Sequence, residues 1–317
     1  MRRQGAGSPL HVGPCRRDGE ERNAGCCLDL RGSRPYSPSV LTLRYVLCDV
    51  FTETPLEGNP LCVFTDARAL DAAKMQALAR ELNLSETTFV LPPEQGGHAR
   101  VRIFTPGREL PFAGHPTLGT AFVLGGPLQM EEIRLELAVG IVPVRLEREG
   151  ARVSYGWMTQ PTPQRSAAPD ERAVLEALGL RSGTLAWQAY DNGVRHLCIG
   201  VAERELVSGL TPDFSALARA CNFGVGVFHY DGQVCKARYF APAGGINEDP
   251  ATGSFAGPLA LQLLADGRLR PGEILRIEQG AEIQRPSTLY ARVSDDAQQR
   301  VEVGGCARIV ARGQFLI

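Results

Sequence analysis

RIFTPGRELPFAGHPTLGTA (residues 102–121) and RYFAPAGGINEDPATGSF (residues 238–255) are two versions of one pattern within a single chain of 317 residues. Each begins Arg-x-Phe-x-Pro, passes through a glycine-containing loop to His-Pro or Asp-Pro, and continues x-x-Gly into apolar residues. Two linked signatures in the same order predict a duplicated unit of strand, loop and helix. Two such halves would naturally bury a ligand between them.

The later part of each copy, PFAGHPTLG or INEDPATGS, predicts a strand end, a loop of small residues and the start of a helix. Free backbone N–H groups at a helix N-terminus favour anions, and Gly114, Thr252 and Gly253 lack bulk that would block close approach. Two such termini facing one cleft would hold a carboxylate or a developing enolate. The alternative for either motif alone is ordinary capping, with Asp249 and Ser254 as N-caps. The recurrence of the motif favours the binding site.

His115 and Asp249 occupy matching places in the two copies. A lone histidine in such a motif is more often a surface or capped residue. A histidine and a carboxylate that converge across a cleft, in contrast, form a normal acid–base arrangement. The match therefore makes both residues candidates for the site.

Glu86 is a third candidate and lies in LNLSETTFVLPP (82–93), where a helical pattern gives way to a strand pattern. Alternation along that strand places Glu86, Thr88 and Val90 on one face. Glu86 is either a solvated edge residue or a carboxylate whose pKa is raised by loss of water, so that it can take and return a proton near neutral pH. A charge at an apolar strand end is costly unless it is paired or used.

Composition argues against several classes of protein. The chain is 44% apolar and 22% charged, with a net charge of −1, and it lacks the basic, aromatic-rich stretches that bind nucleic acids. No run of 18 apolar residues predicts a membrane span. Nine cysteines without Cys-x-x-Cys and five scattered histidines predict reduced, buried thiols in a cytoplasmic protein and no metal site.

Cofactor motifs give no support either. The sequence contains no Gly-x-Ser-x-Gly elbow, phosphate-binding loop or Gly-x-Gly-x-x-Gly, which disfavours a serine hydrolase and a nucleotide cofactor. Lys74 and Lys236 are the only lysines, which makes a pyridoxal Schiff base improbable. We therefore expect no cofactor.

The chain divides into three parts by composition and pattern. Residues 1–43 hold seven arginines and no hydrophobic periodicity, which predicts a disordered extension. We expect a first domain at 44–163 and a second at 164–317, both rich in strands with few helices. Helices are predicted at 71–82 with Asp71 as N-cap, at 115–126 ending at its glycines, at 170–180 and at 214–224. The strand pattern at 301–317 ends the second domain, and its last part either stays there or crosses to the first domain.

Four blocks, GNPLCVF, MQALARELNLSETTFV, RIFTPGRELPFAGHPTLGTA and NEDPATGS, together resemble the phenazine-biosynthesis PhzF-like family over about residues 44–317. The resemblance implies an α+β fold of the diaminopimelate-epimerase superfamily. Its two pseudo-symmetric domains would each be a curved, mainly antiparallel sheet or barrel around a central helix, with the active site between them. The best-known member isomerises trans-2,3-dihydro-3-hydroxyanthranilate by moving a proton between carbons, without metal or organic cofactor. Members are commonly homodimers.

The resemblance also implies which residues act. The family's catalytic glutamate in NLSETTF maps onto Glu86, its cleft histidine in AGHP onto His115, and its acid in EDPATGS onto Asp249. Contacts to the substrate map onto Gly114, Thr252, Gly253 and Ser254. The opposed cysteines of the epimerase relatives have no counterpart in FAGHP or EDPAT, so a two-thiol racemase mechanism is disfavoured.

Two residues bear on how closely the chain follows this pattern. Phe255 is bulkier than the alanine more usual there, and it either narrows the cleft or packs away from it. Pro258 is tolerable inside a helix only if that helix starts near Gly253–Ser254.

The sequence thus predicts a cofactor-independent isomerase in which Glu86 moves a proton between carbons of a small carboxylate-bearing metabolite. His115 and Asp249 would orient the substrate or relay the second proton. Two alternatives stay open: a single-carbon epimerase or racemase with Glu86 and Asp249 as opposed acid and base, and a non-catalytic metabolite-binding protein. The expected partners are the small molecule and a second copy of the chain, with no nucleic acid and no membrane.

Overall fold

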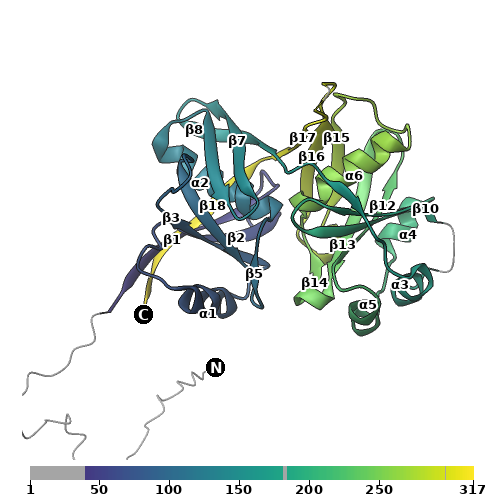
Figure 1. The fold of residues 1–317 in the computed structure, drawn as a ribbon, viewed down its shortest axis with the longest axis horizontal. Helices are drawn as coiled ribbons and strands as arrows, with labels where there is room; N and C mark the ends of the chain where they lie inside the picture. The colour runs from purple at the N-terminus through teal and green to yellow at the C-terminus, as the bar shows by residue number, and fades with distance from the viewer. Residues whose placement is uncertain (1–39, 181–183, 297) are drawn as a thin grey trace, which may run out of the picture. The chain divides into compact units, whose positions relative to one another are not determined.

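The computed structural model describes residues 40–180, 184–296 and 298–317, so most of the extension predicted at 1–43 lies outside the described residues (Figure 1). The first part of the chain contains β1 (Thr42–Val50), β2 (Asn59–Phe64), α1 (Ala72–Leu82), β3 (Glu86–Leu91), β4 (Ala99–Phe104), β5 (Glu109–Leu110), α2 (Gly114–Leu128), β6 (Glu132–Leu137), β7 (Gly140–Glu149) and β8 (Arg152–Thr159).

The second part contains β9 (Gln164–Ser166), α3 (Glu171–Leu178), β10 (Thr184–Asp191), β11 (Arg195–Val201), α4 (Arg204–Ser208), α5 (Phe214–Ala220), β12 (Gly224–Tyr230), β13 (Val234–Ala241), β14 (Ile246–Asp249), α6 (Gly253–Ala265), β15 (Leu275–Gln279), β16 (Ser287–Val293), β17 (Val301–Gly305) and β18 (Ala307–Leu316). Two short 3₁₀ helices, η1 (Pro242–Gly244) and η2 (Ala281–Ile283), interrupt it.

The strands form one mixed sheet that curves twice, once around α2 and once around α6 (Figure 1). The first curve is ordered β18-β1-β2-β3-β4-β6-β7-β8, with only β2–β3 and β4–β6 parallel. The second is ordered β9-β10-β11-β12-β13-β15-β16-β17, with only β11–β12 and β13–β15 parallel. When the neighbouring pairs are counted along each order, the third and the fifth pairs are the parallel ones in both curves. The fold is α+β, as predicted, and the recurring order supports duplication.

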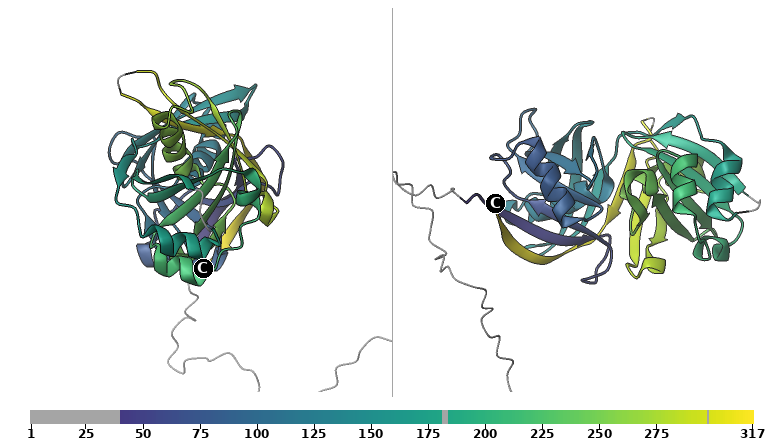
Figure 2. Two further views of the ribbon diagram at one scale, coloured as in Figure 1. Left: turned by 90° about the vertical axis from the view of Figure 1, so that its right-hand side faces the viewer. Right: turned by 90° about the horizontal axis from the view of Figure 1, so that it is seen from below.

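The two central helices are buried because they are apolar on every side, which is typical of a helix enclosed by other structure. Leu118 and Phe122 of α2 and Leu259 and Leu263 of α6 belong to one continuous core. The smaller helices cover the outside of the sheet, α1 on the first curve and α3 to α5 on the second (Figure 2). Pro258 is accommodated because α6 begins at Gly253, which is the start that the sequence required.

Two helix ends differ from the prediction. The glycines near residue 125 do not end α2, which continues to Leu128 and stops at Gln129 in the left-handed region. Gly125 instead makes room for Leu146, whose Cδ1 atom would collide with a Cβ there. The helix predicted at 214–224 ends at Ala220, because Cys221 is extended and leads into β12. The N-cap at Asp71 is confirmed, since its side chain accepts from Lys74 N at 2.8 Å.

The segment 301–317 is two strands that belong to different curves of the sheet. β17 pairs with β16 and β8, whereas β18, after a break at Cys306, pairs along its whole length with β1. The pattern had suggested a continuous run, because both strands alternate and only one residue separates them. The chain therefore ends against the first curve.

Two further expectations concern the cysteines and membranes. The cysteines in the described residues are unpaired, and five of the six are buried, but Cys306 is partly exposed. None of the helices in the described ranges is both long enough and apolar enough to cross a membrane.

Candidate active site

The N-termini of the two central helices meet head to head. A Cβ on Gly114, the first residue of α2, would collide with the backbone of Gly253 and Ser254, where α6 begins. The first N–H groups of each helix have no carbonyl of their own helix to bind, and they carry the positive end of the helix dipole. Their meeting point is therefore suited to a negatively charged group.

Side chains behind this junction hold the start of α6 in place. Gln160 donates to Gly253 O at 2.6 Å, and Asn192 donates to Ser254 O at 2.8 Å. Gln279 donates to Asp249 O at 2.7 Å and accepts from Thr252 N at 3.2 Å. The N-cap of α6 is Thr252, without a side-chain capping bond, and Asp249 lies in β14. The alternative of Asp249 and Ser254 as N-caps is therefore wrong.

Glu86 begins β3 and points to the inside of the first curve. Further along the same face, Thr88 Oγ1 lies 2.9 Å from Thr120 Oγ1 of α2, and Val90 packs into the core. The predicted strand face is thus the face toward α2. Only 8% of Glu86 is exposed, so it is not a solvated edge residue.

The environment of Glu86 keeps its carboxyl group protonated more readily than an ordinary glutamate. Burial raises the pKa of Glu86 well above its usual value, and the negative charge of Asp249 raises it further. Burial also raises the pKa of Asp249, but hydrogen bonds from Thr252, Asn59 and Ser85 oppose this. Within the described residues, the side-chain carboxyl group of Glu86 accepts no hydrogen bond. Asp249 is therefore the member of the pair that ionises first, and Glu86 is the one that holds a proton.

His115 connects the two halves through Asn59. The Asn59 amide nitrogen lies 3.1 Å from His115 Nδ1 and donates to Asp249 Oδ1 at 2.8 Å and to Ala251 O at 3.0 Å. The imidazole is neutral, because burial lowers the pKa of His115 to about 3. If Nδ1 accepts, the ring proton is on Nε2. Nε2 lies 3.4 Å from Glu86 Oε2 and has no hydrogen-bond partner within the described ranges.

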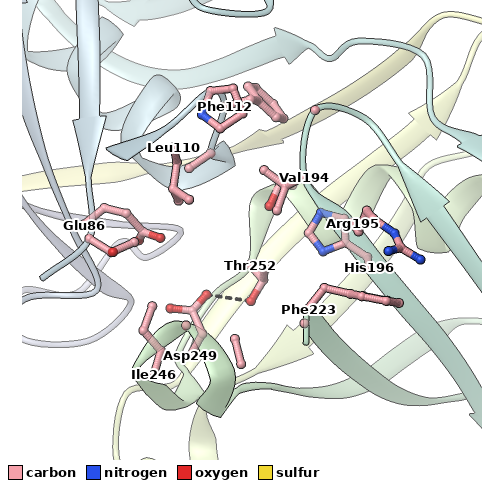
Figure 3. A pocket seen from close by; sticks show the side chains of 18 of the residues that line it. Glu86, Leu110, Phe112, Val194, Arg195, His196, Phe223, Ile246, Asp249 and Thr252 are labelled. Atoms are coloured by element: carbon pink, nitrogen blue, oxygen red, sulfur yellow. Dashed lines mark hydrogen bonds between the residues drawn. The ribbon is translucent and has the colours of Figure 1, made fainter. Parts of the chain in front are cut away.

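A cavity of about 320 Å³ opens beside this group and receives side chains from both halves (Figure 3). Four of the predicted residues line it: Glu86, Asp249, Thr252 and Ser254. His115, Gly114 and Gly253 are not among its lining residues. His115 lies behind Glu86, and Gly114 and Gly253 contact one another at the helix junction. Glu86 enters from one side and Asp249, which accepts from Thr252 Oγ1 at 2.6 Å, from another (Figure 3).

Sequence reasoning missed several residues at the cavity. His196, Arg195 and Tyr239 line it from the second half, and Asn59 links His115 to Asp249. The Asn-Pro of the GNPLCVF block did not reveal this role for Asn59, because Asn-Pro is an ordinary turn-initiating pair. Nothing local marked His196, which lies inside an apolar strand pattern.

Metal ligation receives no structural support in the described ranges, where no three His, Cys, Asp or Glu side chains are arranged to hold an ion. Glu86 and Asp249 are accompanied by a neutral histidine and by hydroxyl and amide donors. The chemistry that this set can provide directly is proton transfer and hydrogen bonding.

Known proteins share both the sequence and the fold. The family model of phenazine biosynthesis-like proteins matches residues 48–313. A trans-2,3-dihydro-3-hydroxyanthranilate isomerase from Pseudomonas fluorescens is 44% identical over 276 residues, which cover 86% of this chain and 99% of the relative.

Solved structures agree. A protein from Pseudomonas aeruginosa that is described as a predicted epimerase is 35% identical in sequence. Its structure matches with a TM-score of 0.75, and the match covers 87% of this chain and 99% of that chain. A hydroxyproline epimerase from Agrobacterium vitis shares only the fold, at 14% identity and a TM-score of 0.61, covering 87% and 93% of the two chains. The chain belongs to the phenazine biosynthesis-like protein family.

Proposed function

We propose that this chain is a cofactor-independent isomerase that moves a proton between two carbons of a small, ring-bearing carboxylate. The compound is trans-2,3-dihydro-3-hydroxyanthranilate or a close analogue. The observation that carries the proposal is Glu86, a buried carboxyl group with a raised pKa and no hydrogen bond in the described residues, directed into a cavity. The 44% identity to isomerases of that name supports the substrate class.

The proposed reaction needs one base that becomes the acid. The Glu86 carboxylate removes a proton from a saturated ring carbon, and the C–H electron pair moves into the neighbouring double bonds. The carboxylic acid so formed returns a proton to another carbon of the same system, so that a double bond shifts and no atom is gained or lost. A carboxyl group with a raised pKa suits both steps, because it is a stronger base than a solvated glutamate and still an acid near neutral pH.

The other residues would place the substrate and its charge. Its carboxylate is proposed to lie at the junction of Gly114, Gly253 and Ser254, where free N–H groups of both helices gather. His115 Nε2 lies 3.4 Å from Glu86 Oε2, and with the ring proton on that nitrogen it would orient the Glu86 carboxylate or relay the second proton. Thr252 and Ser254 also line the cavity.

Asp249 is less suited to act as a second base on carbon, which the epimerase alternative requires. One carboxylate oxygen accepts from Asn59 and the other from Thr252, so both are committed to donors within the protein. We infer that Asp249 is a positioning residue, which holds Asn59 and raises the pKa of Glu86. The non-catalytic alternative has no comparable support, because a binding site gains nothing from an unpaired buried acid.

The proposal includes a domain division and an assembly. We infer two duplicated domains at 44–163 and 164–317, with β18 added to the first, and residues 1–43 as an extension. We infer a homodimer, located in the cytoplasm. The exposed Ile309 and Leu316 on β18 support the dimer, because β18 pairs only with β1 among the described strands. Sedimentation equilibrium tests the assembly directly.

Turnover in D₂O tests the proposed function. With trans-2,3-dihydro-3-hydroxyanthranilate as substrate, we expect a product with a shifted double bond and carbon-bound deuterium, because the Glu86 proton exchanges with solvent before it returns. Mass spectrometry and proton NMR locate the label. Deuterium only at an inverted stereocentre would establish the epimerase. Unchanged substrate without carbon-bound deuterium, for every related carboxylate, would leave a binding protein.

The pH dependence of kcat/KM tests the coupling between the two acids. In the free enzyme kcat/KM should rise with pH as Glu86 ionises, with a midpoint above the ordinary glutamate value of about 4.3. Asp249→Asn removes the negative charge that raises the pKa of Glu86, so the midpoint should move to lower pH. The expected change is a shift of the pH midpoint of kcat/KM, independent of any change in the maximum rate. An unmoved midpoint would contradict the coupling.

A further inference from the structure

The second half of the chain has a glycine at the place where the first half has its catalytic acid. In the first half, Phe104 of the Arg-x-Phe-x-Pro motif pairs with Thr87, so Glu86 is the residue before. In the second half, the motif's Phe240 pairs with Val225, so the residue before is Gly224. Gly224 and Glu86 are thus counterparts in the pairing pattern, at the starts of β12 and β3.

The space above Gly224 is filled by the phenol of Tyr239. A Cβ on Gly224 would collide with the Tyr239 hydroxyl oxygen and lie 2.7 Å from its Cε1 atom. Any side chain at residue 224 would therefore displace Tyr239 from its position. Where the first half presents a carboxyl group, the second presents a hydroxyl group.

Tyr239 forms a buried pair with His196. The Tyr239 hydroxyl oxygen and His196 Nδ1 are 2.6 Å apart, the two residues are 5% and 1% exposed, and both line the cavity. His196 lies across the cavity from Glu86 (Figure 3). Its Nε2 atom is buried and has no hydrogen-bond partner in the described part of the chain.

The pair presents one hydrogen-bond donor that the described residues leave unused. Burial lowers the pKa of His196 to about 3 and raises that of Tyr239, so both side chains are neutral. If Tyr239 donates to His196, the proton on Nε2 is free; if His196 donates to Tyr239, the phenol proton is free. In both cases one of two cavity-lining residues carries a buried donor without an acceptor among the described residues, and such a donor is costly unless a ligand satisfies it.

Phe255 packs against the pair and does not narrow the cavity. Its ring centroid lies 5.3 Å from that of Tyr239 and 6.2 Å from that of His196, and it is not among the cavity-lining residues. Gly226 makes room for it, since a Cβ there would lie 2.7 Å from Phe255 Cε1. The two glycines in GVGV (224–227) lie on the same face of β12, where Gly224 leaves space for Tyr239 and Gly226 leaves space for Phe255.

We propose that His196 and Tyr239 form a specificity subsite that donates a hydrogen bond to a hydroxyl or keto oxygen on the substrate ring, away from the carboxylate. This rests on the proposed function, which places the carboxylate at the helix junction and the reacting carbons at Glu86. The subsite selects a substrate with an oxygen substituent, because an analogue without one leaves the buried donor unpaired.

Binding of two unreactive aromatic acids tests the subsite. The probes are 3-hydroxyanthranilate, which carries a hydroxyl group on the ring, and anthranilate, which lacks that group. Calorimetry gives both affinities. The wild-type chain should bind 3-hydroxyanthranilate at least about tenfold more tightly, a factor typical of one hydrogen bond. The substitution that removes the free donor should bring the ratio near one through the loss of affinity for 3-hydroxyanthranilate, with anthranilate affinity nearly unchanged. That substitution is Tyr239→Phe where the phenol carries the free proton and His196→Gln where Nε2 carries it.

Tyr190→Phe is the matched control. It removes another buried phenol, which donates to Gln262 at 2.8 Å outside the cavity, and it should leave the ratio unchanged. A ratio that survives in both Tyr239→Phe and His196→Gln, or variants that lose both ligands equally, would overturn the subsite. If the wild-type chain binds both probes alike while D₂O turnover is observed, the subsite fails and the isomerase stands. If it binds neither and no turnover is found, both fail.

Discussion

Glu86→Gln is expected to fold as the wild-type chain does and to lose turnover by at least about 10²- to 10⁴-fold, the contribution of one general acid–base group. The amide has nearly the same shape, but it can neither accept the proton from carbon nor return one. Because no hydrogen bond within the described residues holds the Glu86 carboxyl group, the substitution should not disturb a network. Rates of isomerisation and of deuterium incorporation measure the loss together.

The stability of the same variant separates a chemical effect from a folding defect. A carboxyl group whose pKa is raised in the folded state costs stability as pH rises above its unfolded value of about 4.3. Glutamine carries no such cost, so Glu86→Gln should equal the wild type at low pH and become more stable as pH increases, by about 1 kcal/mol per unit of pKa shift. Denaturant unfolding at several pH values measures this difference.

A matched surface control and a contrary outcome complete the test. Glu81→Gln changes an exposed carboxylate on α1 and should alter neither turnover nor stability. Glu86→Gln with wild-type rates would remove this carboxylate from the mechanism. A less stable, inactive variant would instead assign Glu86 a structural role.

The repeated motif predicted the central feature of the site because it is local. Strand, loop and helix start are each specified by neighbouring residues, such as the small residues around Gly114 and Gly253, and the same pattern twice implies two equivalent corners. From it followed that helix termini converge and that His115 and Asp249 lie close. Asn59 bridges those two residues, from which it is separated by 56 and 190 positions in the sequence. No local pattern could specify contacts over such separations.

The details that the sequence did not predict depend on tertiary packing. Gly125 is a packing glycine for Leu146, although by position it is a reasonable helix end. Aspartate is a preferred N-cap residue, but Asp249 lies in β14, and its carboxylate accepts hydrogen bonds from Asn59 and Thr252. The break between β17 and β18 falls at one residue of a continuous alternating pattern. In each case the distant partner, absent from the local sequence, decides the outcome.

His196 and Tyr239 show the same limit at the cavity. Both lie in strands whose alternation predicts buried residues, and a buried histidine is more often part of the core than of a site. Their pairing, and the space over Gly224 that permits it, follow from the register between β11, β12 and β13. That register becomes visible only when the strands are placed.

Gly114→Ala is expected to lose most activity and a measurable part of its stability, although it adds only one methyl group. The added Cβ would collide with the backbone of Ser254 and lie 2.6 Å from Gly253 Cα. Backbone atoms at a helix start cannot swing aside as a side chain can, so the two helix termini must separate. Overpacking of this kind costs about 1–3 kcal/mol.

The loss of activity follows from the geometry of the junction. If both termini hold one carboxylate, moving them apart misplaces the substrate against Glu86, and a displacement of about 1 Å can cost about 10²-fold in rate. Gly126→Ala is the control in the same helix, because a Cβ there meets nothing within 4 Å, and alanine should raise stability by up to about 1 kcal/mol. Unfolding free energies and kcat/KM of both variants decide the matter. Wild-type activity in Gly114→Ala would show that the contact between helix termini does not position the substrate.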